Sequence, residues 1–436
     1  MTARAAEILD REPMGVPQIV IVAMCVLLTA LDGFDVLSIS FASPGIAAEW
    51  GISRAALGVV LSMELIGMAI GSITLGQLAD RFGRRPTILI CLCIMVVGMF
   101  LASTAGSVGI LSGYRLLTGL GIGGMLASTN AMAAEYSNTK YRSLSVSLTA
   151  AGYPMGAIIG GAISSHLLTQ FDWRSVFVFG AIFTAAMLPL VWFLLPESVS
   201  SLSARRPDNA LERINSILKR LGHSAISALP EKSAIETKPG LPQLFTKNLA
   251  RTTTLLIVAF FAHIMTFYFI LKWIPKLVVD MGFAGSEAGG VLVWANVGGA
   301  IGGVLLGILA SKFNVRWLTI GTLAFSFVTV VAFGTGQDTL SKLSLASAFA
   351  GFFTNAGVTG LYAIIAAWFP ADVRAGATGL VIGAGRGGAA LGPIIAGYLF
   401  ETGQTLLTVA ILMALGSVLS LIALLLLGRK SETAAR

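Results

Sequence analysis

Charged side chains are scarce in this chain. Asp, Glu, Lys and Arg make up 11% of its 436 residues, and hydrophobic residues make up 56%. A soluble domain carries about 25% charged residues, so this composition excludes a water-soluble globular protein and predicts an integral membrane protein. A spanning helix needs about 20 apolar residues. Stretches long enough occur at twelve places, namely 17–41, 55–79, 86–106, 109–135, 143–169, 174–195, 250–279, 287–311, 315–335, 339–369, 374–400 and 404–428.

Cysteine and histidine are also rare, with three residues of each. Cys25, Cys91 and Cys93 lie in apolar stretches, where cysteine behaves as a small hydrophobic residue. The sequence contains no cluster of metal ligands, no nucleophile paired with a base and no appended soluble domain. An embedded enzyme or a receptor is therefore disfavoured, and we expect neither a cofactor nor a metal. A full-length apolar run after a short charged tail predicts that there is no cleavable signal peptide.

The basic residues gather on one side of the predicted membrane topology. Loops on the opposite side carry only Arg54, Arg174 and Lys342. Short basic loops stay in the cytoplasm, so we expect a multi-pass protein of the cell (inner) membrane with both termini cytoplasmic. The net charge of +8 then needs no nucleic-acid partner. The basic residues of the predicted cytoplasmic loops are Arg81, Arg84, Arg85, Lys140, Arg142, Lys312, Arg316 and Arg374.

A polar stretch at residues 196–249 divides the twelve predicted spans into six and six. Within it, the sequence predicts a short amphipathic helix that starts at Pro207 and ends at Gly222. We expect this helix to lie on the membrane surface or against the cytoplasmic loops. Its apolar face consists of Leu211, Ile214, Leu218 and Leu221.

The two halves of the chain resemble each other. Such parallel repeats place a substrate site at their interface, near the middle of the membrane. We therefore predict an all-α membrane protein with twelve transmembrane helices in two six-helix halves. Four residues recur at a constant offset of 232, since Arg142, Leu148, Gly156 and Gly160 match Arg374, Leu380, Gly388 and Gly392. The predicted parts are a cytoplasmic tail (1–16), an N-terminal bundle (17–196), a cytoplasmic central loop (197–249), a C-terminal bundle (250–428) and a second cytoplasmic tail (429–436).

Two acids interrupt the first apolar stretch. Asp32 and Asp35 are three residues apart, so they share one face of a helix. A carboxylate in the middle of a bilayer costs about 2.5 kcal/mol or more, so each acid must be protonated, paired or in contact with water. We predict a proton relay, and two acids satisfied by their neighbours are the alternative. Glu64 is a further acid in an apolar stretch, for which Arg115 and Lys272 are both candidate partners.

The eleventh apolar stretch carries a basic residue among glycines. Arg386 stands in Gly385-Arg386-Gly387-Gly388, near the expected middle of its helix. The planar guanidinium group suits bidentate capture of a carboxylate. We predict that Arg386 binds an anionic substrate, and its alternative role is to neutralise Asp32 or Asp35.

The loop after the second apolar stretch reads Gly76-Gln77-Leu78-Ala79-Asp80-Arg81-Phe82-Gly83-Arg84-Arg85. This run resembles the signature of the major facilitator superfamily, although a generic basic turn is the alternative. In that family the loop acts as a conformational latch, which implies this role for Gly76, Asp80, Arg81, Gly83, Arg84 and Arg85. The degenerate copy from Gly307 to Arg316 has Ser311 in place of the acid, so we expect a weaker second latch.

Two further resemblances concern the predicted sites. Arg115, followed by Gly119, Gly121 and Gly123, resembles the family's second motif. The resemblance implies that Arg115 takes part in proton coupling, and we assign Asp32, Asp35 and Glu64 to the same role. The acidic first helix and Arg386 together resemble the aromatic acid:proton symporter branch, whose members import benzoate-like and hydroxybenzoate-like anions. Tyr268 and Trp273 lie much as in that branch and are predicted to bind substrate.

Two residues of the seventh apolar stretch have open roles. Lys272 stands where a small or polar residue is typical of that branch. It can be a second anchor for an anion, or its chain can extend to the membrane surface. His263 can titrate near neutral pH or can be a hydrogen-bonded packing residue. We include both among the predicted substrate-binding residues.

The sequence thus predicts a proton-coupled transporter that imports a small organic anion by alternating access. An aromatic carboxylate is the favoured substrate, and the protein is expected to be a monomer that contacts only substrate, protons and lipid. A porter of aliphatic dicarboxylates or sugar acids is the nearest alternative. Drug/proton efflux is a weaker one, because several cationic side chains are expected to face the cavity.

Overall fold

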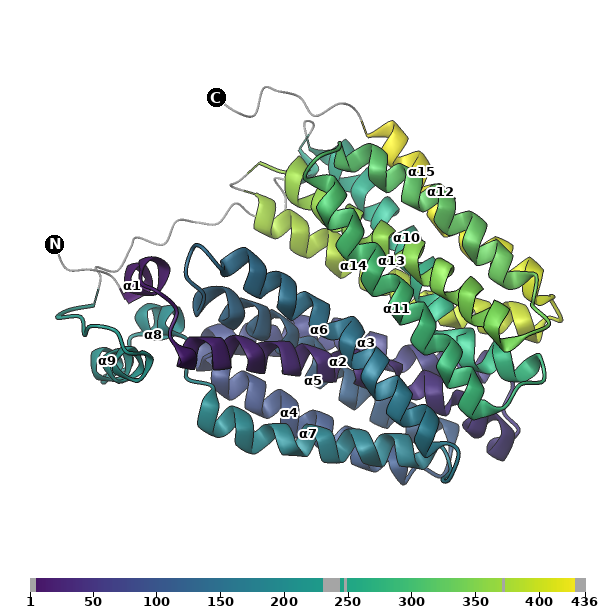
Figure 1. Ribbon diagram of the computed structural model, residues 1–436, viewed down its shortest axis with the longest axis horizontal. Coiled ribbons are helices and arrows are strands. Elements are labelled where there is room, and N and C mark those ends of the chain that lie inside the picture. Colours follow the sequence, from purple (N-terminus) through teal and green to yellow (C-terminus); the bar gives the residue numbers. More distant parts are fainter. Residues whose placement is uncertain (1–4, 230–243, 247–248, 371–372, 428–436) are drawn as a thin grey trace. The chain divides into compact units, whose positions relative to one another are not determined.

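The computed structural model describes residues 5–229, 244–246, 249–370 and 373–427, without the side chains of Asp80 and Ala375. Its regular elements are helices (Figure 1). Twelve helices among the described residues are long and apolar enough to cross a membrane, as predicted. They are α2 (Val16–Trp50), α3 (Arg54–Phe82), α4 (Arg84–Ser103), α5 (Val108–Glu135), α6 (Arg142–Leu167), α7 (Arg174–Leu194), α10 (Ala250–Asp280), α11 (Gly285–Ala310), α12 (Val315–Gly334), α13 (Leu340–Trp368), α14 (Arg374–Glu401) and α15 (Leu406–Leu426).

The first spanning helix is longer than the apolar stretch that predicted it. The stretch ended at residue 41, whereas α2 continues through Pro44 to Trp50. Proline lacks the N–H that would bond the carbonyl four residues earlier. The hydroxyl of Ser43 donates a 2.8 Å hydrogen bond to that carbonyl, on Ser40, so the helix passes the proline with its polar groups satisfied.

The chain forms two compact units. Unit 1 contains Met1–Val36, Gly67–Ala157 and Phe177–Glu236. Unit 2 contains Leu37–Ile66, Ile158–Val176 and Thr237–Arg436. Helices α2, α3, α6 and α7 each contribute one part to either unit. The division into two six-helix halves at residues 197–249, which the sequence predicted, stays a prediction about domain boundaries.

Close contact between α2 and α6 organises unit 1. A Cβ atom on Gly156 would lie 1.7 Å from the carbonyl oxygen of Ala30, and one on Gly33 would lie 2.0 Å from that of Tyr153. Only glycine therefore fits where these helices cross. The contact fixes the acidic stretch of α2 within the unit, while α4 and α5 pack against each other beside it.

Unit 2 is built around α10, which packs against α11, α13, α14 and α15. Figure 1 shows these helices in green to yellow. The first turns of α3 join the unit through Gly58, where a Cβ atom would lie 2.5 Å from the carbonyl oxygen of Pro393 on α14. This close approach holds α3 beside α10 and α14, and it determines where the side chain of Glu64 lies.

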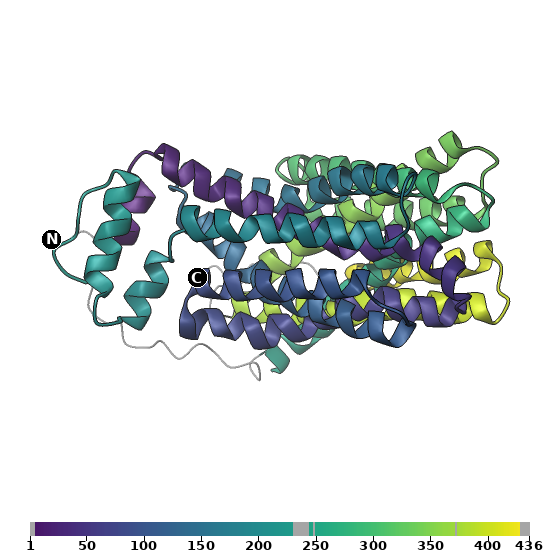
Figure 2. The ribbon, with the colours of Figure 1, turned by 90° about the horizontal axis from the view of Figure 1, so that it is seen from below.

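Three short helices, α1 (Ala5–Arg11), α8 (Val199–Arg205) and α9 (Ala210–Leu221), gather at one end of unit 1 (Figures 1 and 2). Helix α9 confirms the predicted amphipathic helix, but it begins at Ala210 and not at the predicted Pro207. It buries Ile214, Leu218 and Leu221, and Gly222 ends it in the left-handed conformation with a φ of 86°. It packs on α8, and His223, just beyond it, contacts the side chains of Glu12 and Gln18.

Candidate functional site

The first buried charge cluster lies in unit 1 and consists of Asp32, Asp35 and Arg115. Asp32 is 1% exposed, and Asp35 and Arg115 are 0% exposed. The Nη2 atom of Arg115 donates a 2.7 Å hydrogen bond to the main-chain oxygen of Asp35. Arg115 therefore contacts the first spanning helix, and this hydrogen bond is made to the backbone. The predicted role of the three residues in proton coupling stays a prediction.

The surroundings of Arg115 suit a cation that has left water. Its Nη1 atom lies 2.9 Å from the sulfur of Met99, and its guanidinium carbon lies 5.3 Å from the ring centroid of Phe177. A polarisable thioether and an aromatic face both attract a cation. Gly180 leaves room for Met99, since a Cβ atom there would lie 2.1 Å from the Met99 Cε atom.

The second buried charge cluster is an ion pair in unit 2. The Lys272 Nζ atom lies 3.5 Å from the Glu64 Oε2 atom, and both side chains are 0% exposed. The sequence left Arg115 and Lys272 open as partners of Glu64, and the structure joins Glu64 to Lys272. The pair connects α3 to α10, and therefore one helix of each predicted half.

Further polar contacts hold the beginning of α3 at the same end of unit 2. The carboxylate of Glu401 accepts a 2.9 Å hydrogen bond from the main-chain nitrogen of Arg54. The guanidinium of Arg54 pairs with Asp280 at 3.0 Å. The indole nitrogen of Trp273 donates to the carbonyl oxygen of Pro393 at 3.1 Å. Helices α3, α10 and α14 are thus closed against one another where α3 begins.

Trp273 and His263 have structural partners in unit 2. Trp273 is 0% exposed, and its ring centroid lies 5.1 Å from that of Phe400. The two ring nitrogens of His263 lie 3.0 Å from the Ser417 hydroxyl and 2.8 Å from the Thr354 carbonyl oxygen. These contacts favour the packing alternative for His263, and the predicted substrate contacts of both residues stay a prediction.

Arg386 lies in a more open, aromatic environment. It is half-buried, and it acts electrostatically on Tyr362, as does Tyr268. Tyr362 is 43% exposed, and its ring centroid lies 5.2 Å from that of Phe260. A cation that interacts with a tyrosine offers complementary contacts to an aromatic carboxylate. The sequence interpretation missed Tyr362, although a lone tyrosine in the tenth apolar stretch was a usable signal.

The predicted latch loop is held by two glutamates that the sequence interpretation did not include. Gly83 has a φ of 109°, and a Cβ atom on it would lie 2.2 Å from the Glu197 carboxylate. That carboxylate accepts hydrogen bonds from the main-chain nitrogens of Arg84 at 2.9 Å and Arg85 at 3.3 Å. Glutamate at the start of α4 also complements the helix dipole. The available signal was an acid, Glu197, at the start of the polar stretch that begins at residue 196.

The second glutamate of the loop is Glu135, at the end of α5. Its carboxylate pairs with the Arg84 guanidinium at 2.6 Å and accepts a 2.6 Å hydrogen bond from the Ser198 hydroxyl. The Tyr136 hydroxyl donates to the Glu197 carbonyl oxygen, and burial raises the pKa of this phenol well above its usual value. The loop is therefore joined to α5 and to the chain before α8.

The other predicted latch residues contribute less to this network. The Arg81 carbonyl oxygen accepts a 3.3 Å hydrogen bond from Arg205, and no atom would approach a Cβ atom on Gly76 within 4 Å among the described residues. The side chain of Asp80 lies outside the described residues. In the degenerate copy, Arg316 donates to the carbonyl oxygens of Leu424 and Leu425 at 3.0 and 3.1 Å.

No group of three or more metal-ligating side chains occurs among the residues that the structure describes.

The buried charges, the predicted latch loop and the twelve spans are consistent with the family that a comparison with known protein families identifies. The sequence profile of the Major Facilitator Superfamily matches residues 25–336 and 280–436. The chain belongs to the major facilitator superfamily. It is accordingly a multi-pass membrane transporter and not an enzyme, as the sequence predicted.

Its curated relatives carry names that agree with the predicted branch. The gallate transporter of Pseudomonas putida is 31% identical over 398 residues, covering 91% of this chain and 88% of that protein. The 4-hydroxybenzoate transporter PcaK of Pseudomonas aeruginosa is 29% identical over 437 residues, covering 98% and 96%. The benzoate transport protein of Acinetobacter baylyi is 28% identical over 397 residues, covering 87% and 83%. The resemblance to the aromatic acid branch is confirmed.

Solved structures confirm the fold. The xylose transporter XylE of Escherichia coli superposes with a TM-score of 0.74 at 18% identity, covering 96% of this chain and 99% of that one. A bacterial homologue of the human lysosomal transporter Spinster gives a TM-score of 0.72 at 16% identity, covering 95% and 97%. The architecture is that of the major facilitator fold.

Proposed function

We propose that this transporter imports an aromatic carboxylate together with protons. The observation that carries the proposal is the fully buried cluster of Asp32, Asp35 and Arg115. Ionisable residues inside spanning helices are rare, and they mark ion pathways and proton relays. The relatives named for gallate, 4-hydroxybenzoate and benzoate support the substrate class.

The first step of the proposed cycle is protonation of Asp32 or Asp35. Loss of one negative charge weakens the attraction between the first helix and Arg115. Arg115 keeps its hydrogen bond to the Asp35 main-chain oxygen, because that atom does not titrate. The cation therefore stays in place while the carboxylates gain and lose protons.

The second step is capture of the substrate carboxylate by Arg386. The guanidinium fork suits two parallel hydrogen bonds to a carboxylate. Arg386 interacts electrostatically with Tyr362, so the ring of Tyr362 would offer the substrate an aromatic face, and Tyr268 is a candidate second aromatic contact. Lys272 is a candidate second binding group for the substrate carboxylate once its ion pair with Glu64 opens. The opening of this pair would make Glu64 part of the proton coupling. Contacts of His263 and Trp273 with substrate belong to the same proposal.

The third step is alternating access. Opening of the end where α3 begins would separate Glu64 from Lys272 and Arg54 from Asp280. At the other end of α3, we assign the latch role to the loop from Gly76 through Asp80, Arg81, Gly83, Arg84 and Arg85. The basic loops support an inner-membrane protein with cytoplasmic termini, and we propose that it works as a monomer.

Proteoliposome uptake driven by an inward proton gradient tests this function. Labelled 4-hydroxybenzoate or benzoate should accumulate inside, and a protonophore should abolish the accumulation. Asp32→Asn should lose gradient-driven uptake but retain exchange of external label for internal substrate, because exchange requires no net proton movement. Arg386→Ala should lose binding itself, while Arg386→Lys, which keeps the charge without the fork, should bind with intermediate affinity.

Other outcomes would contradict the proposal. Accumulation of a sugar acid or an aliphatic dicarboxylate without aromatic acids would show that the substrate class is wrong. Proton-driven extrusion of lipophilic drugs would replace import by efflux. Equal binding by wild type and Arg386→Ala would remove the anchor role from Arg386.

A further inference from the structure

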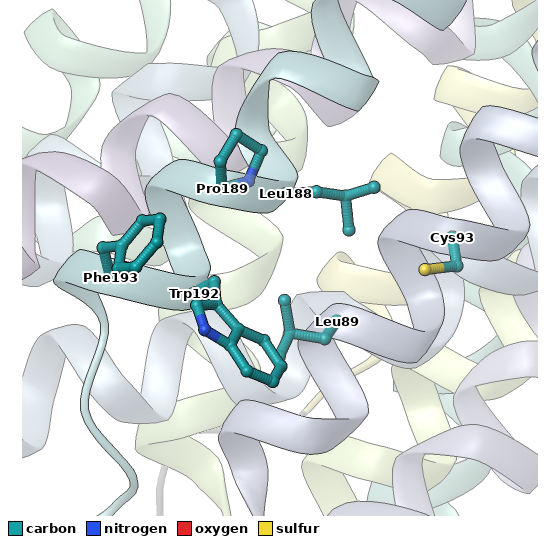
Figure 3. Close-up of a pocket in the computed structure, with 6 residues that line it drawn as sticks. All are labelled: Leu89, Cys93, Leu188, Pro189, Trp192 and Phe193. Carbon is teal, nitrogen blue, oxygen red and sulfur yellow. The ribbon is translucent and has the colours of Figure 1, made fainter.

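An apolar groove lies on unit 1 between α4 and α7. Its volume is about 390 Å³, and six apolar side chains line it. Figure 3 shows Leu89 and Cys93 coming from one helix and the other four residues from the facing one. Trp192 and Phe193 are 58% and 70% exposed. The six residues are Leu89, Cys93, Leu188, Pro189, Trp192 and Phe193.

Two arginines reach the same end of this groove from different elements. Arg85, in the first turn of α4, donates to the Trp192 carbonyl oxygen, and its guanidinium carbon lies 5.2 Å from the Trp192 ring centroid. Arg220 of α9 donates to the carbonyl oxygen of Phe193 at 2.8 Å. Both cations therefore lie at the last turn of α7, which also forms the wall of the groove.

The guanidinium groups of Arg85 and Arg220 differ from that of Arg84 in their hydrogen-bond partners. The Arg84 guanidinium pairs with Glu135, and the nearby Glu197 carboxylate accepts from main-chain nitrogens at the start of α4. The hydrogen bonds of the Arg85 and Arg220 guanidinium groups within the described part of the chain go to neutral carbonyl oxygens. Both groups thus keep their positive charge available for an anion.

We propose that this groove binds one anionic phospholipid, with an acyl chain between α4 and α7 and its phosphate at Arg85 and Arg220. Apolar surface beside a tryptophan and basic residues is the usual arrangement at the headgroup level of a membrane. Basic pockets between spanning helices bind anionic lipid headgroups. Arginine binds phosphate through two parallel hydrogen bonds. The lipid would then connect α4, the latch loop and α9 from outside the bundle.

Native mass spectrometry of the full-length protein in detergent tests the affinity. Dioleoyl phosphatidylglycerol should bind as a single retained molecule, and dioleoyl phosphatidylcholine, with the same chains and no net charge, should bind far more weakly. Each arginine near an anionic headgroup contributes about fivefold in affinity, so Arg85→Gln/Arg220→Gln should lose about thirtyfold. Glutamine keeps an N–H donor for the α7 carbonyls, so the fold is expected to survive.

Lys219→Gln is the matched control for the single variant Arg220→Gln, because this exposed lysine precedes Arg220 on the same helix and each substitution removes one positive charge. It should retain phosphatidylglycerol binding. Equal loss in the control would reduce the effect to general surface charge and overturn the proposal. A complex with the mass of two copies of the chain and no lipid would assign the groove to a protein contact, which would also overturn it.

Cys93 reports on occupancy of the groove. Cys25 and Cys91 are buried, whereas Cys93 is exposed, so N-phenylmaleimide should modify Cys93 first. Phosphatidylglycerol should slow this modification, and phosphatidylcholine should slow it less. The protection should disappear in Arg220→Gln, which alters only the surface helix. Equal protection by the two lipids, or protection that persists without Arg220, would contradict the proposed headgroup site.

Discussion

Among the described residues, Arg115 and Lys272 are two fully buried cations, and the contacts around them differ in kind. Arg115 bonds a main-chain oxygen and lies against a thioether and an aromatic ring. Lys272 lies against the carboxylate of Glu64. None of these three contacts of Arg115 involves a group that titrates. The contact of Lys272 depends on the charge of the Glu64 carboxylate. These contacts would hold Arg115 in place if a neighbouring carboxylate gained a proton, whereas protonation of Glu64 would remove the charge that faces Lys272.

The first prediction breaks the second cluster. Glu64→Leu alone strands the Lys272 cation in a fully buried site, so the apparent free energy of unfolding should fall by about 3–5 kcal/mol. The double variant Glu64→Leu/Lys272→Met replaces both charges by apolar groups and should recover most of this loss. Thermal unfolding of the purified variants in detergent measures both effects.

A control for this comparison lies one turn along α10. Lys276 pairs with Asp280 four residues later, and both side chains are partly exposed. Because exposed ion pairs contribute little, Lys276→Met should cost about 0–1 kcal/mol. If Glu64→Leu cost no more than Lys276→Met, the buried pair would have no special role in holding α3 to α10.

The second prediction separates backbone and carboxylate contributions in the first cluster. Arg115→Lys removes the planar donor group that reaches the Asp35 oxygen, and a hydrogen bond from a charged group is worth about 1.5–3 kcal/mol. Proton-driven uptake should therefore fall by about tenfold to a hundredfold. Asp35→Asn leaves that main-chain contact intact, so it should affect coupling to the proton gradient more than thermal stability.

The readouts for these variants are uptake with and without a proton gradient, together with the melting temperature. A large loss of stability in Asp35→Asn with unchanged proton dependence would reverse the assignment. The carboxylate would then be a structural group, and the satisfied-acid alternative for Asp32 and Asp35 would hold.

The sequence predicted the fold and the costly charges well, for a simple physical reason. Twelve apolar stretches and two acids in the first of them are visible in composition alone, because the bilayer restricts which residues can span it. The continuation of α2 through Pro44 was not visible, since it depends on the hydroxyl of Ser43 bonding the freed carbonyl of Ser40. A local side-chain bond decided that helix boundary.

The partners of the buried charges were harder to predict than the charges themselves. Glu64 and Lys272 come from α3 and α10, and they meet because α3 packs against α14 at Gly58 and is bonded to α10 and α14 through Arg54. Arg115 bonds an oxygen that every residue possesses, so no side-chain pattern could indicate it. Tyr362 and Glu197 were missed because their roles arise from helix packing and not from a local motif.

The last prediction concerns Trp273, which follows Lys272 in the sequence. It asks whether Trp273 contacts substrate or only stabilises the packing of α10 against α14. Trp273→Phe removes the hydrogen bond to the Pro393 oxygen and keeps the aromatic ring. A neutral hydrogen bond is worth about 1 kcal/mol, so the variant should be slightly less stable and should bind substrate as wild type does. A matched fall in substrate affinity at unchanged melting temperature would instead make Trp273 a substrate contact. Such a result would extend the binding site from Arg386 to the closed end, where Lys272 meets Glu64, and would favour Lys272 as a second anchor.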